Sequence, residues 1–301
     1  MTPIAILGGG SWGTALAILL SRSPKRHSVS LWVHDPEVAA AIRRDAVNAT
    51  YLPGCKVPAE VRVTSDEGQA LAGARIVLGV MPSAHARTVY SRALPHLSPE
   101  MVFVSATKGL EPDRHARMSE VITQVISPKF PPRIAVLSGP SFALEAARGD
   151  PTAVVLASHD MALASTLQEE LAGPTFRLYT NEDVLGVEYA GATKNVIAIA
   201  AGACQGVGLG SNTLAALITR GLAEMSRLAV ALGGLAETLT GLAGLGDLVL
   251  TCTGALSRNR HVGVELGRGR PLAGILAETR MVAEGVHTTQ AVLDAARARG
   301  V

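Results

Sequence analysis

A run of glycines near the N-terminus has the spacing of a phosphate-binding turn. Gly8, Gly10 and Gly13 form the pattern G-x-G-x-x-G between a predicted strand at residues 4–7 and a predicted helix at residues 14–20. In this context the first glycine permits a tight turn, the second lets the backbone approach a diphosphate, and the third lets the helix pack on the strand. The helix N-terminus then offers N–H groups and a partial positive charge to an anion. The pattern favours a dinucleotide site over a glycine turn that binds nothing.

The end of the second predicted strand, residues 29–33, bears on which dinucleotide binds. His34 and Asp35 follow this strand, and a predicted helix after them carries Arg43 and Arg44. An acidic residue about 20 positions beyond the glycines holds the ribose hydroxyls of NAD, whereas a cationic group nearby accommodates the 2′-phosphate of NADP. Both NAD and NADP therefore remain open as cofactors.

A single lysine interrupts an apolar helix in the second half of the chain. Residues 186–202 are predicted to form this helix, in which Lys194 is followed by Asn195. Burying an ammonium group costs several kcal/mol unless it is paired or neutralised. An isolated lysine would instead extend its stem to water, with Asn195 capping or packing. The polar residues further along the chain favour a catalytic lysine.

A glycine-rich stretch at residues 240–260 concentrates groups that bind anions and hydroxyls. Its glycines predict a loop that wraps closely around a ligand. Arg258 can form two parallel hydrogen bonds with phosphate oxygens, and Asn259 and Thr251 can bind phosphate or hydroxyl groups. The alternative is a solvated loop with surface arginines.

Two further segments place polar residues at the ends of predicted strands. Lys108 follows the strand at residues 102–105, and Gly139 and Ser141 follow the strand at residues 134–137. A doubly wound sheet binds its ligands outside the carboxyl ends of its strands. An ordinary surface lysine is the alternative for Lys108, but its position favours contact with a ligand.

Short β-rich runs alternate with helical segments through the first half of the chain, which predicts an α/β fold with a doubly wound, Rossmann-type and mostly parallel sheet. The expected strands lie at residues 4–7, 29–33, 61–64, 76–80, 102–105, 134–137, 153–156 and 176–179. The expected helices between them lie at residues 14–20, 36–43, 85–94, 118–126 and 161–171. Beyond these, Ala-rich and Leu-rich segments predict helices at residues 184–204, at 213–232 and from 284 onward. We therefore expect a dinucleotide-binding domain at residues 1–181 and an all-α substrate and catalytic domain at residues 182–301.

Composition and charge exclude several other classes of protein. Of the 301 residues, 48% are hydrophobic and 17% charged, and the 27 basic and 25 acidic residues form no like-charged run that would bind nucleic acid. The cysteines Cys55, Cys204 and Cys252 lie outside any metal-ligand spacing, which predicts reduced thiols and no metal site. Glycines interrupt the apolar N-terminus, and no apolar stretch approaches the ~20 residues that span a bilayer. We expect a cytoplasmic protein without stable membrane insertion.

Together these segments resemble bacterial NAD(P)-dependent glycerol-3-phosphate dehydrogenase over nearly the whole chain. The resemblance is carried by many motifs in the family's order, which is far more specific than the glycine turn alone. These motifs are GGGSWG at residues 8–13, YLPG at 51–54, PS at 82–83, TKGL at 107–110, SGPSFA at 138–143, AGATKNV at 190–196, LITRGLAEM at 217–225, GLAGLGD at 241–247 and SRNR at 257–260.

The resemblance implies reversible reduction of dihydroxyacetone phosphate, a phosphorylated triose, to sn-glycerol 3-phosphate for glycerophospholipid synthesis. It implies that Lys194 is the catalytic acid/base. With the reasoning above, the candidate substrate-binding residues are Lys108, Gly139, Ser141, Lys194, Asn195, Asp247, Thr251, Ser257, Arg258 and Asn259. The candidate cofactor-binding residues are Gly8, Gly10, Ser11, Trp12, Gly13, His34, Lys108, Ala143, Arg258, Val282 and Glu284. A homodimer is a further expectation.

In this reaction the nicotinamide delivers a hydride while Lys194 gives a proton to the developing alkoxide. Burial and the charge of Lys108 would lower the pKa of Lys194 towards neutrality. Asp247 would orient Lys194 or bind a substrate hydroxyl. Arg258 and Asn259 would hold the phosphate, so that remote binding energy aligns the carbonyl group.

The sequence departs from the family pattern at His34, a position that is often Arg, and this keeps NAD and NADP both open. The family also usually continues into further helical residues beyond the position of Val301, so contacts that depend on them are not predicted here. Two alternative functions stay open. One is a related dehydrogenase for a 3-hydroxy acid or a ketopantoate-like substrate, with a carboxylate-binding group at residues 257–259. The other is a non-catalytic NAD(P) sensor.

Overall fold

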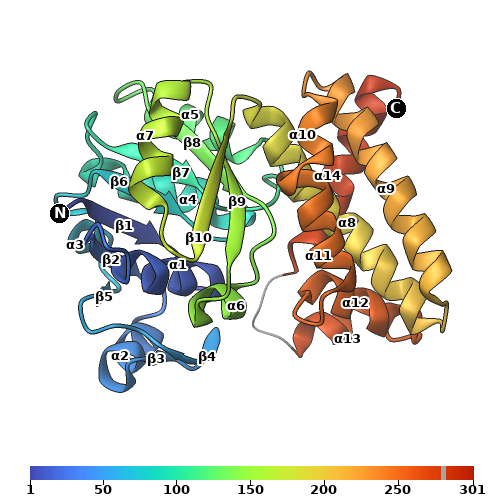
Figure 1. Ribbon diagram of the computed structural model, residues 1–301, viewed down its shortest axis with the longest axis horizontal. Helices are drawn as coiled ribbons and strands as arrows, with labels where there is room; N and C mark the ends of the chain where they lie inside the picture. The colour runs from blue at the N-terminus through green and yellow to red at the C-terminus, as the bar shows by residue number, and fades with distance from the viewer. Residues whose placement is uncertain (279–282) are drawn as a thin grey trace.

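One eight-stranded sheet forms the N-terminal half of the protein. The computed structural model describes residues 1–278 and 283–301, and Figure 1 shows the sheet with its helices beside a second, helical half. The strand order is β10-β9-β8-β7-β6-β1-β2-β5, and neighbouring strands are parallel except β8 and β9. The strands are β1 (Pro3–Leu7), β2 (Ser28–Trp32), β5 (Arg62–Thr64), β6 (Ile76–Gly79), β7 (Val102–Ser105), β8 (Arg133–Ser138), β9 (Thr152–Ala157) and β10 (Phe176–Asn181). The prediction of a mostly parallel sheet is confirmed.

Helices cover both faces of the sheet because its central strands are apolar on both sides. Strands β6 and β7 are buried at every residue. Side chains on one face pack against α1, α2, α6 and α7, and those on the other face pack against α3, α4 and α5. These helices are α1 (Ser11–Ser21), α2 (Pro36–Asp45), α3 (Glu67–Leu71), α4 (Ser83–Ala93), α5 (Met118–Ile126), α6 (Ala143–Arg148) and α7 (Met161–Leu171).

The strand order reverses between β1 and β6, because β2 lies beyond β1 and β7 lies beyond β6. In doubly wound sheets a ligand crevice forms outside the carboxyl ends of the strands at this point. Gly8 follows β1 and packs so closely on the segment after β6 that a Cβ at Gly8 would lie 2.7 Å from the Val80 oxygen. The glycine-rich turn is therefore at the place where the fold forms a crevice.

A small antiparallel hairpin near this turn was not among the expected strands. It consists of β3 (Val47–Asn48) and β4 (Leu52–Lys56), with an irregular register between Val47 and Asn48. Pro53 and Gly54 within β4 are poor strand formers, and β3 has only two residues, so residue preferences gave no strand signal here.

The helical half is built around α8 (Val184–Gly206), which packs against α9, α11, α12 and α14. Figure 1 shows these helices grouped on the side of the molecule away from the N-terminus. The remaining elements are α9 (Ser211–Ala231), α10 (Ala236–Thr240), the π-turn Leu242–Gly246, α11 (Asp247–Thr253), α12 (Arg258–Gly267), α13 (Leu272–Ala277) and α14 (Glu284–Arg299). None of the helices in residues 1–278 and 283–301 has both the length and the apolarity needed to cross a membrane.

Glycines bring α8 and α12 into backbone contact. A Cβ at Gly202 of α8 would lie 1.9 Å from the Arg260 oxygen, and one at Gly263 of α12 would lie 1.9 Å from the Ile199 oxygen. Such distances cannot accommodate a side chain. This close packing places the start of α12 beside the middle of α8, where Lys194 lies.

The prediction of a loop at residues 240–260 was wrong, because these residues are mostly helical. A π-turn runs directly into α11, and only four residues separate α11 from α12. The glycines serve helix packing instead: a Cβ at Gly244 would lie 2.0 Å from the Leu239 oxygen. The sheet ends where the helical half begins, because β10 ends at Asn181 and α8 begins at Val184. A domain division at residues 181 and 182 stays a prediction.

Candidate active site

One cavity of about 730 Å³ joins the glycine-rich turn to the helical half of the protein. Its walls come from both halves, so they combine residues far apart in the sequence. The candidate residues that line it are Gly8, Gly10, Ser11, Trp12, His34, Lys108, Ser141, Ala143, Lys194, Asn195, Asp247, Thr251, Ser257, Arg258, Asn259 and Glu284. The predicted cofactor and substrate residues thus face a single space.

Two candidate residues act from outside this lining. Gly13 packs on the turn itself, since a Cβ at Gly13 would lie 1.8 Å from the Gly8 oxygen. The Gly139 carbonyl accepts a hydrogen bond of 2.7 Å from Lys108 Nζ. A third candidate, Val282, lies outside the described residues.

Helix α1 begins at the glycine-rich turn, with its N-terminus at the cavity. Gly10 precedes the helix in an extended conformation, and a Cβ at Gly10 would meet no atom within 4 Å. The first N–H groups of a helix have no partner within the helix and carry a partial positive charge. The turn therefore offers the space and the donors that a dinucleotide diphosphate requires.

His34 and Asp35 line one part of the cavity but differ in what they offer a ligand. Asp35 caps α2, because its Oδ1 accepts hydrogen bonds from the backbone N of Glu37 at 2.9 Å and of Val38 at 3.3 Å. His34 is exposed, with its ring 5.8 Å from that of Trp32. One carboxylate oxygen is thus engaged in capping while the imidazole is accessible, and the two side chains together fit either cofactor.

Lys194 is held almost wholly away from bulk water. It is 4% exposed, and its Nζ donates to Thr251 Oγ1 at 3.1 Å and pairs with Asp247 Oδ1. Thr251 Oγ1 in turn donates to the backbone oxygen of Asp247 at 2.5 Å, one turn earlier in α11. The alternative of a lysine stem extended to bulk water is wrong.

The Asp247 carboxylate bridges two ammonium groups. Its Oδ2 lies 2.9 Å from Lys108 Nζ, which also donates to Ser141 Oγ at 3.0 Å. Asp247 itself is 1% exposed. One carboxylate between two lysines leaves a positive cluster beside the cavity when both lysines are protonated. Such a cluster favours an oxygen that gains negative charge.

Burial determines the ionisation of these groups. Burial lowers the pKa of Lys194 to about 7, the Asp247 carboxylate opposes this shift, and the Lys108 charge adds to it. Burial alone would raise the pKa of Asp247, but the two ammonium groups hold this pKa below its ordinary value. At neutral pH Asp247 is therefore ionised, while Lys194 exists in both its protonated and its neutral form. Such an amine can donate or accept a proton.

The N-terminus of α12 presents a guanidinium to the cavity. Ser257 caps this helix by accepting a hydrogen bond of 3.2 Å from the Arg260 backbone N. Arg258 is exposed and lines the cavity. The surrounding protein lowers the pKa of Arg258, and the charge of Glu284 opposes this shift. An accessible guanidinium at a helix N-terminus suits a phosphate.

Asn259 has a different environment from the one expected of a phosphate ligand. Its Nδ2 donates to Asn195 Oδ1 at 2.9 Å, and its Oδ1 accepts from the Gly285 backbone N at 3.0 Å. It therefore ties α8, α12 and α14 together, and one N–H of its amide remains for a ligand.

Two contacts at this site were not predicted. Ser83, at the start of α4, donates from its backbone N at 3.2 Å and its Oγ at 2.8 Å to Glu284. Asn48, in the hairpin, donates to the Gly9 carbonyl oxygen of the glycine-rich turn at 2.9 Å. The sequence contains both residues beside recognisable motifs, but only the fold shows their partners.

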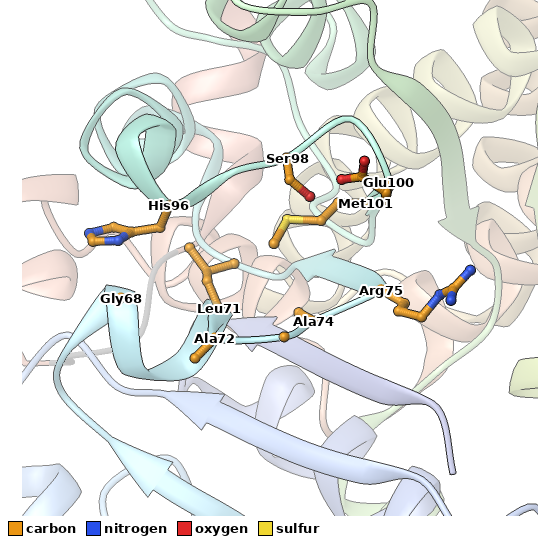
Figure 2. A pocket seen from close by; sticks show the side chains of 10 residues that line it. Gly68, Leu71, Ala72, Ala74, Arg75, His96, Ser98, Glu100 and Met101 are labelled. Atoms are coloured by element: carbon orange, nitrogen blue, oxygen red, sulfur yellow. The ribbon is translucent and has the colours of Figure 1, made fainter.

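A second hollow of about 500 Å³ lies elsewhere on the sheet domain. Its lining includes Arg75 and Met101, each of which directly precedes a strand, so it lies at the amino ends of β6 and β7. Figure 2 shows the side chains of Arg75 and His96 pointing away from each other. This is not the edge where such sheets bind ligands. Among the described residues, no group of three or more His, Cys, Asp or Glu could hold a metal ion.

Comparisons with known proteins agree with this site. The family models for the N-terminus and the C-terminus of NAD-dependent glycerol-3-phosphate dehydrogenase match residues 3–164 and 183–301. Glycerol-3-phosphate dehydrogenase (NAD(P)+) of Koribacter versatilis is 58% identical over 100% of this chain and 89% of its own length. The crystal structure of glycerol-3-phosphate dehydrogenase from Coxiella burnetii superposes with a TM-score of 0.94 and 41% identity, over 100% of this chain and 90% of that one. The chain belongs to the NAD-dependent glycerol-3-phosphate dehydrogenase family.

Proposed function

We propose that this protein reduces dihydroxyacetone phosphate to sn-glycerol 3-phosphate, reversibly, with NADH or NADPH. The single observation that carries the proposal is Lys194, a buried amine with a pKa of about 7 that shares one cavity with the glycine-rich turn. Family membership and 58% identity to a named glycerol-3-phosphate dehydrogenase support the same reaction.

When bound, the reduced nicotinamide supplies the hydride that the ketone carbon accepts. The protonated Lys194 donates its proton to the ketone oxygen and becomes a neutral amine. In the reverse direction the neutral amine takes the hydroxyl proton of glycerol 3-phosphate. The Thr251 hydroxyl and the Asp247 carboxylate hold the Lys194 amine at a fixed position, so that the proton reaches one oxygen.

Arg258 is the proposed phosphate ligand, with Ser257 and Asn259 beside it. Its guanidinium is accessible in the same cavity as Lys194 and can form two hydrogen bonds with one phosphate group. Phosphate binding at the N-terminus of α12 would place the far end of a three-carbon substrate near the amine of α8.

The same proposal covers the roles of the two halves of the chain, the location of the protein in the cell and its oligomeric state. We propose that residues 1–181 and 182–301 act as a coenzyme domain and a substrate domain, that the protein works in the cytoplasm, and that it forms a homodimer. The buried thiols of Cys55 and Cys252, both unpaired with another cysteine, fit a reducing compartment. Sedimentation of the purified protein tests the dimer.

The proposal is tested by following the absorbance of NADH or NADPH with dihydroxyacetone phosphate and then with dihydroxyacetone. We expect kcat/KM to fall at least 1,000-fold, or ~4 kcal/mol, without the phosphate, because remote binding energy would be lost. Turnover of both ketones at equal rates would contradict the phosphate site. Turnover of a 3-hydroxy acid or of ketopantoate alone would favour the related dehydrogenases.

A further inference from the structure

Asn48 is the last residue of β3 in the hairpin, and its side chain is fully buried against the glycine-rich turn. It is 0% exposed, and its Nδ2 donates to two acceptors, the Gly9 carbonyl oxygen at 2.9 Å and Thr14 Oγ1 at 2.8 Å. Its Oδ1 accepts a hydrogen bond of 3.1 Å from the Tyr51 backbone N. The amide therefore connects the chain reversal of the hairpin to the turn that opens α1.

The bond to Gly9 fixes the direction of one peptide group in the turn. The described residues contain no cis peptide bond, and a trans peptide points its N–H opposite to its carbonyl. Because the Gly9 carbonyl points at Asn48, the Gly10 N–H of the same peptide points away from the hairpin. Gly10 lines the cavity, and a Cβ on it would meet no atom within 4 Å.

The same segment of the hairpin also touches the start of α1 directly. Ser11 Oγ donates to the Tyr51 carbonyl oxygen at 2.6 Å, and Tyr51 lines the cavity. Asn48 thus contacts the turn from outside the cavity, while Tyr51, Leu52 and Pro53 form part of the cavity wall.

We propose that Asn48 is a positioning residue for the coenzyme: its side-chain amide holds the Gly9–Gly10 peptide so that the Gly10 N–H faces the coenzyme diphosphate. This inference rests on the proposed function, since it requires that a dinucleotide binds in the cavity. Asn48 touches neither the substrate site nor Lys194, so its removal acts on coenzyme binding and leaves the proton-transfer group in place.

The decisive variants are Asn48→Ala and Asn48→Asp. The first removes the two donors. The second keeps the shape of the side chain but points a carboxylate oxygen at the Gly9 carbonyl, which repels it. A buried hydrogen-bonding group left without its partner weakens an interaction by roughly tenfold or more. We expect KM for NADH or NADPH, and the dissociation constant of ADP-ribose measured by calorimetry, to rise about tenfold in Asn48→Ala and further in Asn48→Asp. The KM for dihydroxyacetone phosphate and kcat at saturating coenzyme should change less than threefold.

Ser158→Ala is the matched control. Ser158 is also buried, at 1% exposure, and its Oγ donates to the Ile134 carbonyl oxygen at 2.8 Å. It is not among the residues that line the cavity. We expect this variant to lower the melting temperature as a lost buried hydrogen bond does, with coenzyme KM unchanged.

A coenzyme KM and an ADP-ribose dissociation constant that stay at the wild-type values in both Asn48 variants would overturn the inference. Equal losses of kcat and of affinity for every ligand would also overturn it, because they indicate general unfolding. If neither variant folds, Thr14→Val decides the question, since it removes one of the two acceptors of Asn48. It should raise coenzyme KM about threefold, and an unchanged KM would contradict the inference. Failure of the wild-type protein to bind NADH and NADPH would instead contradict the proposed function.

Discussion

At the scale of single residues, the site depends on a charge balance among two buried groups, Asp247 and Lys194, and the partly buried Lys108. Asp247 is held between Lys108 and Lys194, whose ammonium groups lower the pKa of Asp247, and the charge of Lys108 also lowers the pKa of Lys194. Without the carboxylate, burial and the charge of Lys108 would together favour the neutral form of Lys194. Asp247 therefore keeps a substantial fraction of Lys194 protonated at neutral pH.

This balance predicts the pH dependence of the reaction and of Asp247→Asn. Reduction requires protonated Lys194, so its kcat/KM should fall as pH rises through about 7, the pKa of Lys194, while oxidation should rise over the same range. Asp247→Asn removes the interaction that raises this pKa, so the decline of reduction should move to lower pH, with at least a tenfold loss at pH 7. Rate profiles in both directions check this. A decline that moves to higher pH would contradict the electrostatic argument.

We expect His34 to affect a second property at this scale, the choice between NADH and NADPH. Its exposed ring lies near the residue that caps α2, where the adenosine ribose binds in this fold. His34→Asp would place a negative charge near a 2′-phosphate. The ratio of kcat/KM for NADPH to that for NADH should fall at least about tenfold, or ~1.4 kcal/mol. A ratio that is unchanged or higher would show that His34 does not face the 2′ position.

At the scale of elements, the contact between α8 and α12 sets the position of the Lys194 amine relative to Arg258, the proposed phosphate ligand. Lys194 lies on the first helix and Arg258 starts the second, so any separation of the two helices moves one group relative to the other. The glycines at the contact allow no Cβ on either side. The packing of these helices is thus as much a part of the site as its polar residues.

Gly263→Ala tests this helix contact. A Cβ at Gly263 would lie 1.9 Å from the Ile199 backbone oxygen, so the helices must separate. We expect a loss of about 2–3 kcal/mol in the free energy of unfolding and a lower kcat for the folded fraction. Denaturant unfolding and steady-state kinetics measure the two effects. Gly274→Ala is the control, because a Cβ there meets only Pro271 Cγ at 3.8 Å. Equal behaviour of the two variants would contradict the assigned role.

At the scale of the whole molecule, periodicity predicted the regular elements well. All eight expected strands of the sheet form, and α8, α9 and α14 lie close to their expected ranges, because long apolar runs carry a strong local signal. The hairpin β3–β4 and the short helices α3, α6 and α10 to α13 were not predicted. Their few residues form these elements only through contacts with the rest of the fold, such as Asn48 with Gly9.

The candidate site shows the same division between local and long-range information. Residue types and motifs identified Lys194, Asp247 and Arg258, all of which line the cavity. The sequence could not show that Asp247 would bridge two lysines. Nor could it show that the side-chain amide of Asn259 would form hydrogen bonds with Asn195 and Gly285. Such pairings join residues dozens of positions apart, and only the packed fold specifies them.

Lys194→Ala shows whether the Lys194 amine is the proton donor and acceptor. The only two tryptophans, Trp12 and Trp32, both line the cavity, so energy transfer from tryptophan to bound NADH reports coenzyme binding in the same samples. We expect coenzyme affinity to change less than about threefold, while kcat for dihydroxyacetone phosphate falls by about 1,000-fold at pH 7. Turnover within tenfold of the wild-type rate, with coenzyme still bound, would contradict this role of Lys194.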